Sequence, residues 1–265
     1  MPMRKIVFLT GGSSGIGLQT ALALKNAGCT VYEMSRKDAD HPGIFHLSGD
    51  VTKPETIRAA VDAVLEKEGR IDILVNNAGF GISGAIEFTT PEEARKQMDV
   101  NFFGMVNVCA AVLPHMRAAG AGRIVNLSSV AAPIAIPFQA FYSASKAAIN
   151  AYSQALANEV RPYGVTVCAV MPGDIRTGFT AAREKQARGD EAYGGRIARS
   201  VAKMEHDEQT GMDPAKAGAY IAGLALRRSV KPLYAIRADY KFFVMLSRLL
   251  PVRTLSWLVY QLYAK

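Results

Sequence analysis

Short apolar or β-branched runs alternate with longer helical patterns along most of the chain, and this alternation is the strongest constraint on its fold. Strands are predicted at residues 5–9, 30–35, 43–47, 71–75, 122–127, 165–170 and 232–236. Helices long enough to cross the face of a sheet are predicted at 15–27, 54–68, 91–119, 140–163 and 214–226. This order is typical of parallel strands joined by helical crossovers. We therefore predict an α/β fold with a three-layer, doubly wound parallel sheet of the Rossmann type.

The length of the chain suits one domain of this kind. The 265 residues, 49% of them apolar, provide one sizeable core but not a second full domain. We predict a nucleotide-binding catalytic domain over 1–239, with residues 180–211 forming a mobile lid over the substrate. A basic and apolar helical extension is predicted over 240–265.

A glycine-rich turn with the sequence TGGSSGIG joins the first predicted strand to the first predicted helix. Gly11 permits the tight turn, Gly15 lets the backbone approach a pyrophosphate, and Gly17 allows close packing of the helix. The helix amino terminus adds N–H donors and positive potential. The turn predicts a dinucleotide site at Gly11, Ser13, Ser14, Gly15, Ile16 and Gly17.

The end of the second predicted strand indicates which dinucleotide binds. An NAD-binding unit places an acidic residue about twenty positions after the glycines, but this chain has the small, neutral Ser35 there. Arg36 and Lys37 follow, and both can pair with a 2′-phosphate. NADP(H) is therefore favoured over NAD, although the two cations could also form a solvated turn. Glu33 is nearby, but its position inside the strand argues against a ribose contact.

Four motifs in order give the chain its family resemblance. They are the TGxxxGxG spacing at residues 10–17, NNAG at 76–79, Asn101, and Ser129 followed by YSASK at 142–146. The chain resembles the short-chain dehydrogenase/reductase family, in its single-domain branch of roughly 250 residues, which includes carbonyl reductases and hydroxysteroid dehydrogenases. The resemblance extends to about residue 226 and implies an oxidoreductase that moves a hydride between NADP(H) and a ketone, aldehyde or alcohol.

Tyr142 and Lys146 are four positions apart on a predicted helix, so their side chains lie on one face, one turn apart. A neighbouring ammonium stabilises phenolate, and we expect it to move the tyrosine pKa from near 10 toward neutral pH. Tyr142 would then exchange a proton with the substrate oxygen. The resemblance further implies that Lys146 holds the nicotinamide ribose.

Two more residues complete the catalytic set that the resemblance implies. Ser129, thirteen residues before Tyr142, corresponds to the serine that binds the substrate oxygen, whereas we give Ser128 a structural role at the strand end. Asn101 corresponds to the asparagine that holds a water in a proton relay near the lysine. It could equally be a polar residue that kinks its helix.

The resemblance also implies further contacts with the nucleotide. Asp50 and Val51 correspond to residues that contact the adenine, although Asp50 could also cap the helix ahead of Pro54. The remaining positions are Asn77, Ala78 and Gly79 in the NNAG motif, and Pro172, Gly173, Ile175 and Thr177 after the sixth strand.

The loops expected around the substrate are apolar. Their large side chains are Phe80, Ile82, Ile134, Ile136, Phe138 and Phe179, which predicts a hydrophobic steroid-like, retinoid-like or long-chain acyl carbonyl or alcohol as substrate. Five cations in the predicted lid could meet an anionic group, but we favour a solvated face for them: Arg183, Lys185, Arg188, Arg196 and Arg199.

The charge of the chain is concentrated at its carboxyl end. The net charge is +8, and residues 227–265 account for +7 of it. No basic groove with interleaved aromatic residues or recognition helix is evident, so a nucleic-acid partner is not expected. The apolar spacing of Leu255, Leu258, Val259 and Leu262 predicts one helix face suited to the substrate mouth, a subunit contact or a membrane surface.

The remaining composition concerns metals and location. The four histidines and three cysteines show no metal-ligand spacing, so we expect no metal. The cysteines, each in or beside an apolar run, suggest buried thiols in a reduced environment, and we expect a cytoplasmic protein. A peripheral contact with a membrane through 240–265 stays open, as does homodimer or homotetramer assembly, which is common in the family.

Two alternatives to a carbonyl reductase follow from the same sequence. One is a lipid-pathway ketone reductase that works at a membrane surface, which the basic and apolar extension favours. The other is an NADP-sensing binding protein without turnover, which the presence of Ser129, Tyr142 and Lys146 disfavours.

Overall fold

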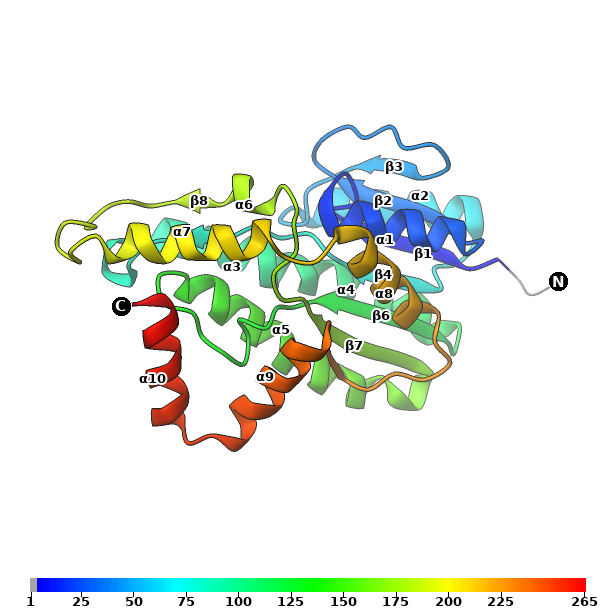
Figure 1. Ribbon diagram of the computed structural model, residues 1–265. Helices are drawn as coiled ribbons and strands as arrows, with labels where there is room; N and C mark the ends of the chain where they lie inside the picture. The colour runs from blue at the N-terminus through cyan, green and yellow to red at the C-terminus, as the bar shows by residue number, and fades with distance from the viewer. Residues whose placement is uncertain (1–3) are drawn as a thin grey trace.

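A seven-stranded, all-parallel sheet forms the centre of the protein in a computed structural model that describes residues 4–265 (Figure 1). The strand order is β3-β2-β1-β4-β6-β7-β9. The strands are β1 Ile6–Thr10, β2 Thr30–Ser35, β3 Phe45–Ser48, β4 Ile73–Asn76, β6 Gly122–Leu127, β7 Val165–Met171 and β9 Leu233–Ala235. The predicted Rossmann-type sheet is confirmed. From β1 the chain adds β2 and β3 on one side of the sheet, and it then returns to the other side of β1 to form β4.

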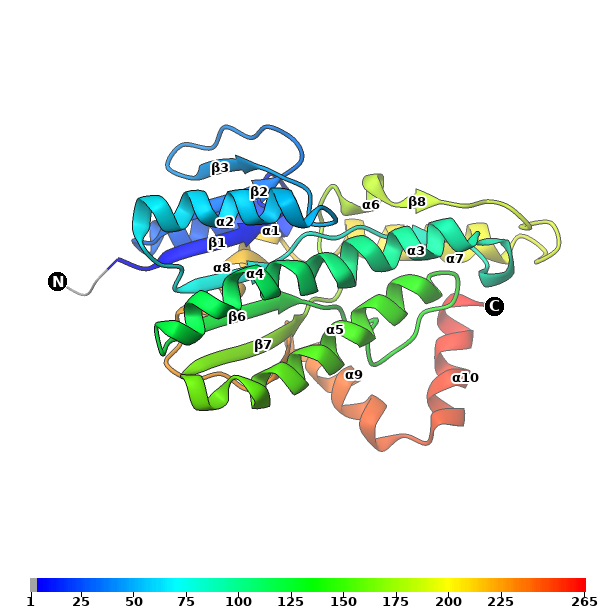
Figure 2. The same cartoon turned by 180° about the vertical axis from the view of Figure 1, so that it is seen from behind.

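Helices cover both faces of this sheet (Figures 1 and 2). One face carries α2 Pro54–Glu68, α4 Gly104–Ala118 and α5 Ala140–Glu159, and the other carries α1 Gly15–Asn26 and α8 Pro214–Leu226. Because side chains alternate along a strand, Ile6 and Phe8 join the first core while Val7 and Leu9 join the second. Burial on both faces explains the uninterrupted apolar runs seen in the sequence.

The helix predicted over 91–119 is divided in the structure. It consists of α3 Pro91–Met98, a π-helical segment η2 Asp99–Phe103, and α4. Asn101 lies in this wide segment, consistent with a helix-distorting residue. The helix predicted over 140–163 ends at Glu159, and a short 3₁₀ turn, η3 Arg161–Tyr163, follows with Pro162 near its start. Proline lacks the N–H that would continue the α-helix.

The segment predicted as a mobile lid contains a helix that the sequence reasoning missed. This helix is α7 Arg196–Gln209, preceded by the short α6 Phe179–Ala182 and by β8 Glu184–Lys185, which pairs with β5 Ile82–Ser83. A further 3₁₀ turn, η1 Ile86–Phe88, follows β5. Ile197, Ser200 and Met204 form the buried side of α7. Closure of this segment over a ligand stays a prediction.

Two helices, α9 Ala238–Leu249 and α10 Val252–Tyr263, form the carboxyl-terminal extension. Together they make a V whose bend points away from the body in both views (Figures 1 and 2). Among residues 4–265, no helix has the length and apolar character needed to cross a bilayer. In the predicted apolar face of α10, Val259 is buried and Leu255 and Leu258 are half-buried, whereas Leu262 is exposed.

Candidate active site

A cavity of about 740 Å³ lies at the carboxyl ends of the parallel strands. The turns after β1, β2, β4, β6 and β7 all contribute to its walls, as expected for a doubly wound sheet. Nearly all the residues that we assigned to the nucleotide line this cavity: Gly11, Ser13, Ser14, Gly15, Ile16, Ser35, Arg36, Asp50, Val51, Asn77, Ala78, Gly79, Tyr142, Lys146, Pro172, Gly173, Ile175 and Thr177. Gly17 is not part of the lining.

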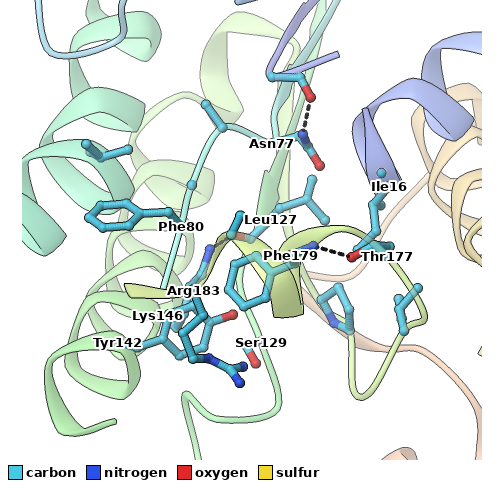
Figure 3. A pocket seen from close by; sticks show the side chains of 18 of the residues that line it. Ile16, Asn77, Phe80, Leu127, Ser129, Tyr142, Lys146, Thr177, Phe179 and Arg183 are labelled. Atoms are coloured by element: carbon cyan, nitrogen blue, oxygen red, sulfur yellow. Dashed lines mark hydrogen bonds between the residues drawn. The ribbon is translucent and has the colours of Figure 1, made fainter. Parts of the chain in front are cut away.

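The glycine-rich turn forms a cradle at one end of the cavity. Gly15 has φ +57°, a left-handed conformation that favours glycine. A Cβ on Gly17 would lie 2.1 Å from the carbonyl oxygen of Gly11, so this glycine is required where helix α1 packs against the turn. Asn77 donates its side-chain amide to that same oxygen at 2.8 Å (Figure 3). The cradle therefore fits a dinucleotide, with the amino terminus of α1 beneath it.

The cavity ends beside two cations at the carboxyl end of β2. Arg36 and Lys37 are exposed, and no ion pair involves either of them within the described part of the chain. Glu33, in contrast, is fully buried, accepts a hydrogen bond from Gly12 N at 3.1 Å and pairs with His46. Its carboxylate thus supports the glycine-rich turn and does not line the cavity, which agrees with the interpretation of its strand position.

Asp50 also lines the cavity, and its local contacts favour neither of its two predicted roles. Its Oδ1 accepts hydrogen bonds from Thr52 N at 2.9 Å and from Thr52 Oγ1 at 2.8 Å. The residue before α2 that serves as its N-cap is Lys53, which makes no side-chain cap. Asp50 therefore shapes the turn ahead of the helix without capping it directly.

Tyr142 and Lys146 lie on one side of α5 and face the cavity, as their spacing predicted (Figure 3). The Lys146 ammonium lies 5.6 Å from the centre of the Tyr142 ring and donates to the carbonyl oxygen of Leu127 at 2.8 Å. Ser129 lines the cavity too, and its Oγ accepts from Ala131 N at 3.1 Å. Ser128 Oγ donates to the carbonyl oxygen of Lys146 at 3.0 Å, which agrees with its predicted structural role.

The protonation of this pair differs from the expectation. Burial raises the pKa of Tyr142 to about 12, and hydrogen bonding with Ser129 only partly opposes this. Burial also lowers the pKa of Lys146 from 10.5 to about 8. The prediction that the ammonium moves the tyrosine pKa toward neutral was wrong for this structure, because desolvation dominates and the ammonium is bound to a carbonyl oxygen. Tyr142 is thus a protonated phenol at neutral pH.

Asn101 is buried beside this group without lining the cavity. Its Oδ1 accepts from Phe80 N at 3.0 Å, and its Nδ2 donates to the carbonyl oxygen of Phe80 at 3.0 Å and to Ser145 Oγ at 3.1 Å. These bonds hold the loop after β4 against α5. A role in a proton relay stays a prediction.

The substrate end of the cavity is less apolar than the sequence indicated. Phe80, Ile136 and Phe179 line it, but Ile82, Ile134 and Phe138 do not. Charged and phenolic groups that sequence reasoning did not place in the site stand beside them: Asp174, Arg183, Glu184, Glu208, Tyr240 and Tyr263. Of these, only Asp174 has a local signal, because it directly follows the Pro172-Gly173 pair.

Arg183 was expected on a solvated face, and this was wrong. Its side chain is only 1% exposed, forms an ion pair with Glu208, and stacks on Phe179 with its guanidinium carbon 5.6 Å from the ring centre (Figure 3). Its Nε and Nη1 are buried without a hydrogen-bond partner among the described residues. Arg183 therefore brings positive charge close to Tyr142, and Glu208 brings negative charge to the same wall.

The described residues contain no cluster of three or more His, Cys, Asp or Glu side chains that could hold a metal ion. All three cysteines, Cys29, Cys109 and Cys168, are buried and free. Burial raises the pKa of each thiol, which keeps them protonated and unreactive.

Comparisons with known proteins agree with this arrangement. The family model for short chain dehydrogenases matches residues 5–188. A 3-ketodihydrosphingosine reductase from Bacteroides thetaiotaomicron is 46% identical over 228 residues, covering 85% of each chain. The crystal structure of a short-chain dehydrogenase from Streptomyces avermitilis is 33% identical, with a TM-score of 0.84 over 92% of each chain.

Two further solved structures contain nicotinamide nucleotides. ElxO with NADP bound is 26% identical, with a TM-score of 0.75 over 91% of this chain and 100% of that one. A 3-ketoacyl-(acyl-carrier-protein) reductase from Brucella melitensis complexed with NADH is 26% identical, with a TM-score of 0.73 over 88% and 96%. Structural relatives thus hold either nucleotide.

Proposed function

Because this chain belongs to the short-chain dehydrogenase family of oxidoreductases, we propose that it reduces the ketone of a long-chain lipid with NADPH. The observation that carries this proposal is the arrangement of Tyr142, Lys146 and Ser129 along one wall of the 740 Å³ cavity. The nucleotide cradle lies at the other end of the same cavity. An acid and a nucleotide site that share one cavity suit hydride and proton transfer to a carbonyl.

The preference for NADPH over NADH rests on the residues after β2. Arg36 and Lys37 are exposed cations at the cavity rim, and Ser35 adds no negative charge beside them. A ribose 2′-phosphate could accept charge-assisted hydrogen bonds from both. When bound, the nucleotide would supply the hydride, which is the chemistry of its own ring.

The chain itself would supply orientation and a proton. Tyr142, like an ordinary tyrosine, keeps its phenolic proton at neutral pH, and burial raises its pKa further, to about 12. It can donate this proton to a carbonyl oxygen as the negative charge develops. Ser129 Oγ would be a second donor to that oxygen. Lys146, held at the Leu127 carbonyl, keeps positive charge on the floor of the site.

The choice of a lipid ketone rests on the cavity and on one relative. The aromatic rings of Phe80 and Phe179 suit a hydrocarbon chain, and the ring centres of Phe179 and Tyr142 are 5.8 Å apart. The 46% identical relative from Bacteroides is a 3-ketodihydrosphingosine reductase. The polar wall formed by Asp174, Arg183 and Glu208 favours a ketone with a polar head over a steroid or a retinoid.

The test is a panel of long-chain keto lipids, steroids and retinoids, with consumption of NADPH followed by absorbance. We expect turnover with a keto lipid, and a decrease of kcat by roughly 100-fold or more in Tyr142→Phe. The matched control is Tyr163→Phe, because Tyr163 is an exposed residue of a surface turn. Full turnover by Tyr142→Phe, or turnover with steroids alone, would contradict the proposal. Nucleotide binding without turnover of any substrate would instead favour an NADP-sensing protein.

A further inference from the structure

Exposed apolar side chains are concentrated in the V formed by α9 and α10. Of thirteen large hydrophobic residues that are exposed within 4–265, eight belong to these two helices: Phe242, Phe243, Met245, Leu249, Val252, Trp257, Tyr260 and Leu262. A water-exposed apolar surface of this kind is rare unless a partner covers it.

The bend of the V is its most exposed apolar part. Leu249 and Val252, on either side of Leu250 and Pro251, are 72% and 80% exposed, the two highest values among the large hydrophobic side chains. The bend is also the part of the V farthest from the sheet in both views (Figures 1 and 2). An apolar tip held away from the body can enter a surface without a clash with the rest of the protein.

Positive charge surrounds this tip. Arg248 and Arg253 flank it and are both exposed, and two more exposed cations are Lys241 on α9 and Lys265 just past the end of α10. The one acidic residue on them, Asp239, is paired with Arg237. The surface therefore joins apolar side chains to unopposed cations, the combination by which amphipathic helices bind anionic lipid.

A hollow beside α9 also combines apolar side chains with cations. It encloses about 270 Å³ between α9 and the edge of the sheet, and its apolar lining is Met171, Leu233, Ala235, Val244, Met245 and Leu249. Lys241 and Arg248 also line it, seven residues apart and hence on one side of the helix. Two cations beside an apolar hollow suit a phosphate and the first part of an acyl chain.

From these observations we infer that the bend and outer faces of α9 and α10 bind the surface of an anionic phospholipid membrane. A second copy of the chain would be a poorer occupant, because a two-fold contact through this surface would bring like charges together. An anionic leaflet instead complements the cations and covers the apolar tip.

The same helices border the catalytic cavity. Tyr240, in the first turn of α9, and Tyr263, at the end of α10, both line it. A membrane bound at the bend would therefore lie at the far ends of the two helices whose other ends line the cavity. If the proposed function is right, a lipid ketone can present its head to Tyr142 while its chain stays close to the bilayer. Membrane binding itself does not depend on that function.

The test uses the full chain without nucleotide or substrate and vesicles of phosphatidylcholine with or without phosphatidylserine. The chain contains one tryptophan, Trp257 on α10, which is 58% exposed and reports directly on insertion. We expect a blue shift of its emission and co-sedimentation with the phosphatidylserine vesicles, both decreasing as salt rises. Equal binding to both vesicle types, or none to either at low salt, would overturn the inference.

Variants then locate the surface. The double variant Leu249→Ser with Val252→Ser and the double variant Arg248→Glu with Arg253→Glu should each lower partitioning at least tenfold. Ile86→Ser and Arg58→Glu, exposed residues outside the extension, should bind like the parent chain. All four variants should keep their nucleotide affinity, which shows that they are folded. The vesicle assay requires no turnover, so its outcome is independent of whether the proposed reaction is correct. Binding equal to that of the parent in both double variants would refute the assignment, as would a loss of self-association in them with unchanged vesicle binding.

Discussion

The buried ammonium of Lys146 should destabilise the protein at neutral pH, and the pH dependence of stability can reveal this. The residue is 6% exposed, and burial lowers its pKa from 10.5 to about 8. This difference corresponds to about 3 kcal/mol of unfolding free energy, by which the charged form is disfavoured in the folded state.

The sign follows from proton binding in the two states. Below pH 8 the lysine is protonated in both the folded and the unfolded chain, so the whole cost is present. Between pH 8 and 10.5 the unfolded chain binds a proton that the folded chain lacks, and the free energy of unfolding rises with pH. Above 10.5 both states are neutral at this position and the cost is absent.

Replacing the residue with methionine removes this pH dependence. The Lys146→Met variant also leaves the carbonyl oxygen of Leu127 without its donor, which costs about 1–3 kcal/mol at every pH. At pH 7 the two effects oppose each other, so the variant should be about as stable as the parent or slightly more stable. As the pH rises from 7 to 10, the parent should gain about 2–3 kcal/mol relative to the variant.

Urea unfolding at a series of pH values, without nucleotide, measures this difference. Other titrating groups are shared by parent and variant and largely cancel in the comparison. Lys216→Met is the matched control, because Lys216 is an exposed residue of α8 and should show no such trend. A difference between Lys146→Met and the parent that stays constant from pH 7 to 10, or that changes in favour of the variant, would refute the reasoning.

Three further predictions concern the nucleotide and the charged wall. Arg36→Ala should raise the KM for NADPH roughly tenfold or more and leave the KM for NADH nearly unchanged, since only NADPH has a 2′-phosphate. Equal effects on both KM values would argue against a contact between Arg36 and that phosphate. Gly17→Ala should weaken NADPH binding and destabilise the fold by about 1–3 kcal/mol in urea unfolding, because its Cβ would overlap the turn. The control is Gly223→Ala, which has open space around it and should be neutral or stabilising. Arg183→Met should shift the pH at which alcohol oxidation accelerates to higher values, because Arg183 lowers the pKa of Tyr142, and an unchanged pH profile would contradict this.

The sequence predicted the parts of the site that depend on local spacing. Tyr142 and Lys146 are one helical turn apart, and the glycine-rich turn requires its glycines within eight residues, so neither needs knowledge of distant contacts. The alternation of apolar runs likewise predicted every strand of the main sheet. The inner strands are buried on both faces and leave an unbroken apolar signal, whereas the edge strands β3 and β9 are only partly buried.

The missed parts depend on tertiary contacts. Arg183 looks like any surface cation in the sequence, and only the arrival of α7 with Glu208, 25 positions later, buries it against Phe179. The predicted direction of the Tyr142 pKa shift was wrong for a related reason. Spacing shows that Lys146 is near, but it does not show that the ammonium is bound to Leu127 or how far the site is desolvated.

The carboxyl-terminal extension contacts the Pro172-Gly173 loop directly through Tyr240. The ring of Tyr240 covers Gly173 so closely that a Cβ there would lie 2.2 Å from it, and the Tyr240 hydroxyl hydrogen-bonds to the Asp174 carboxylate. Burial raises the pKa of Asp174, and the hydrogen bond from Tyr240 lowers it. A shift of α9 would therefore change both the packing of the Pro172-Gly173 loop and the hydrogen bond that Asp174 accepts on the cavity wall. Since α9 begins at this contact, the same helix that ends at the bend also packs against the cavity wall.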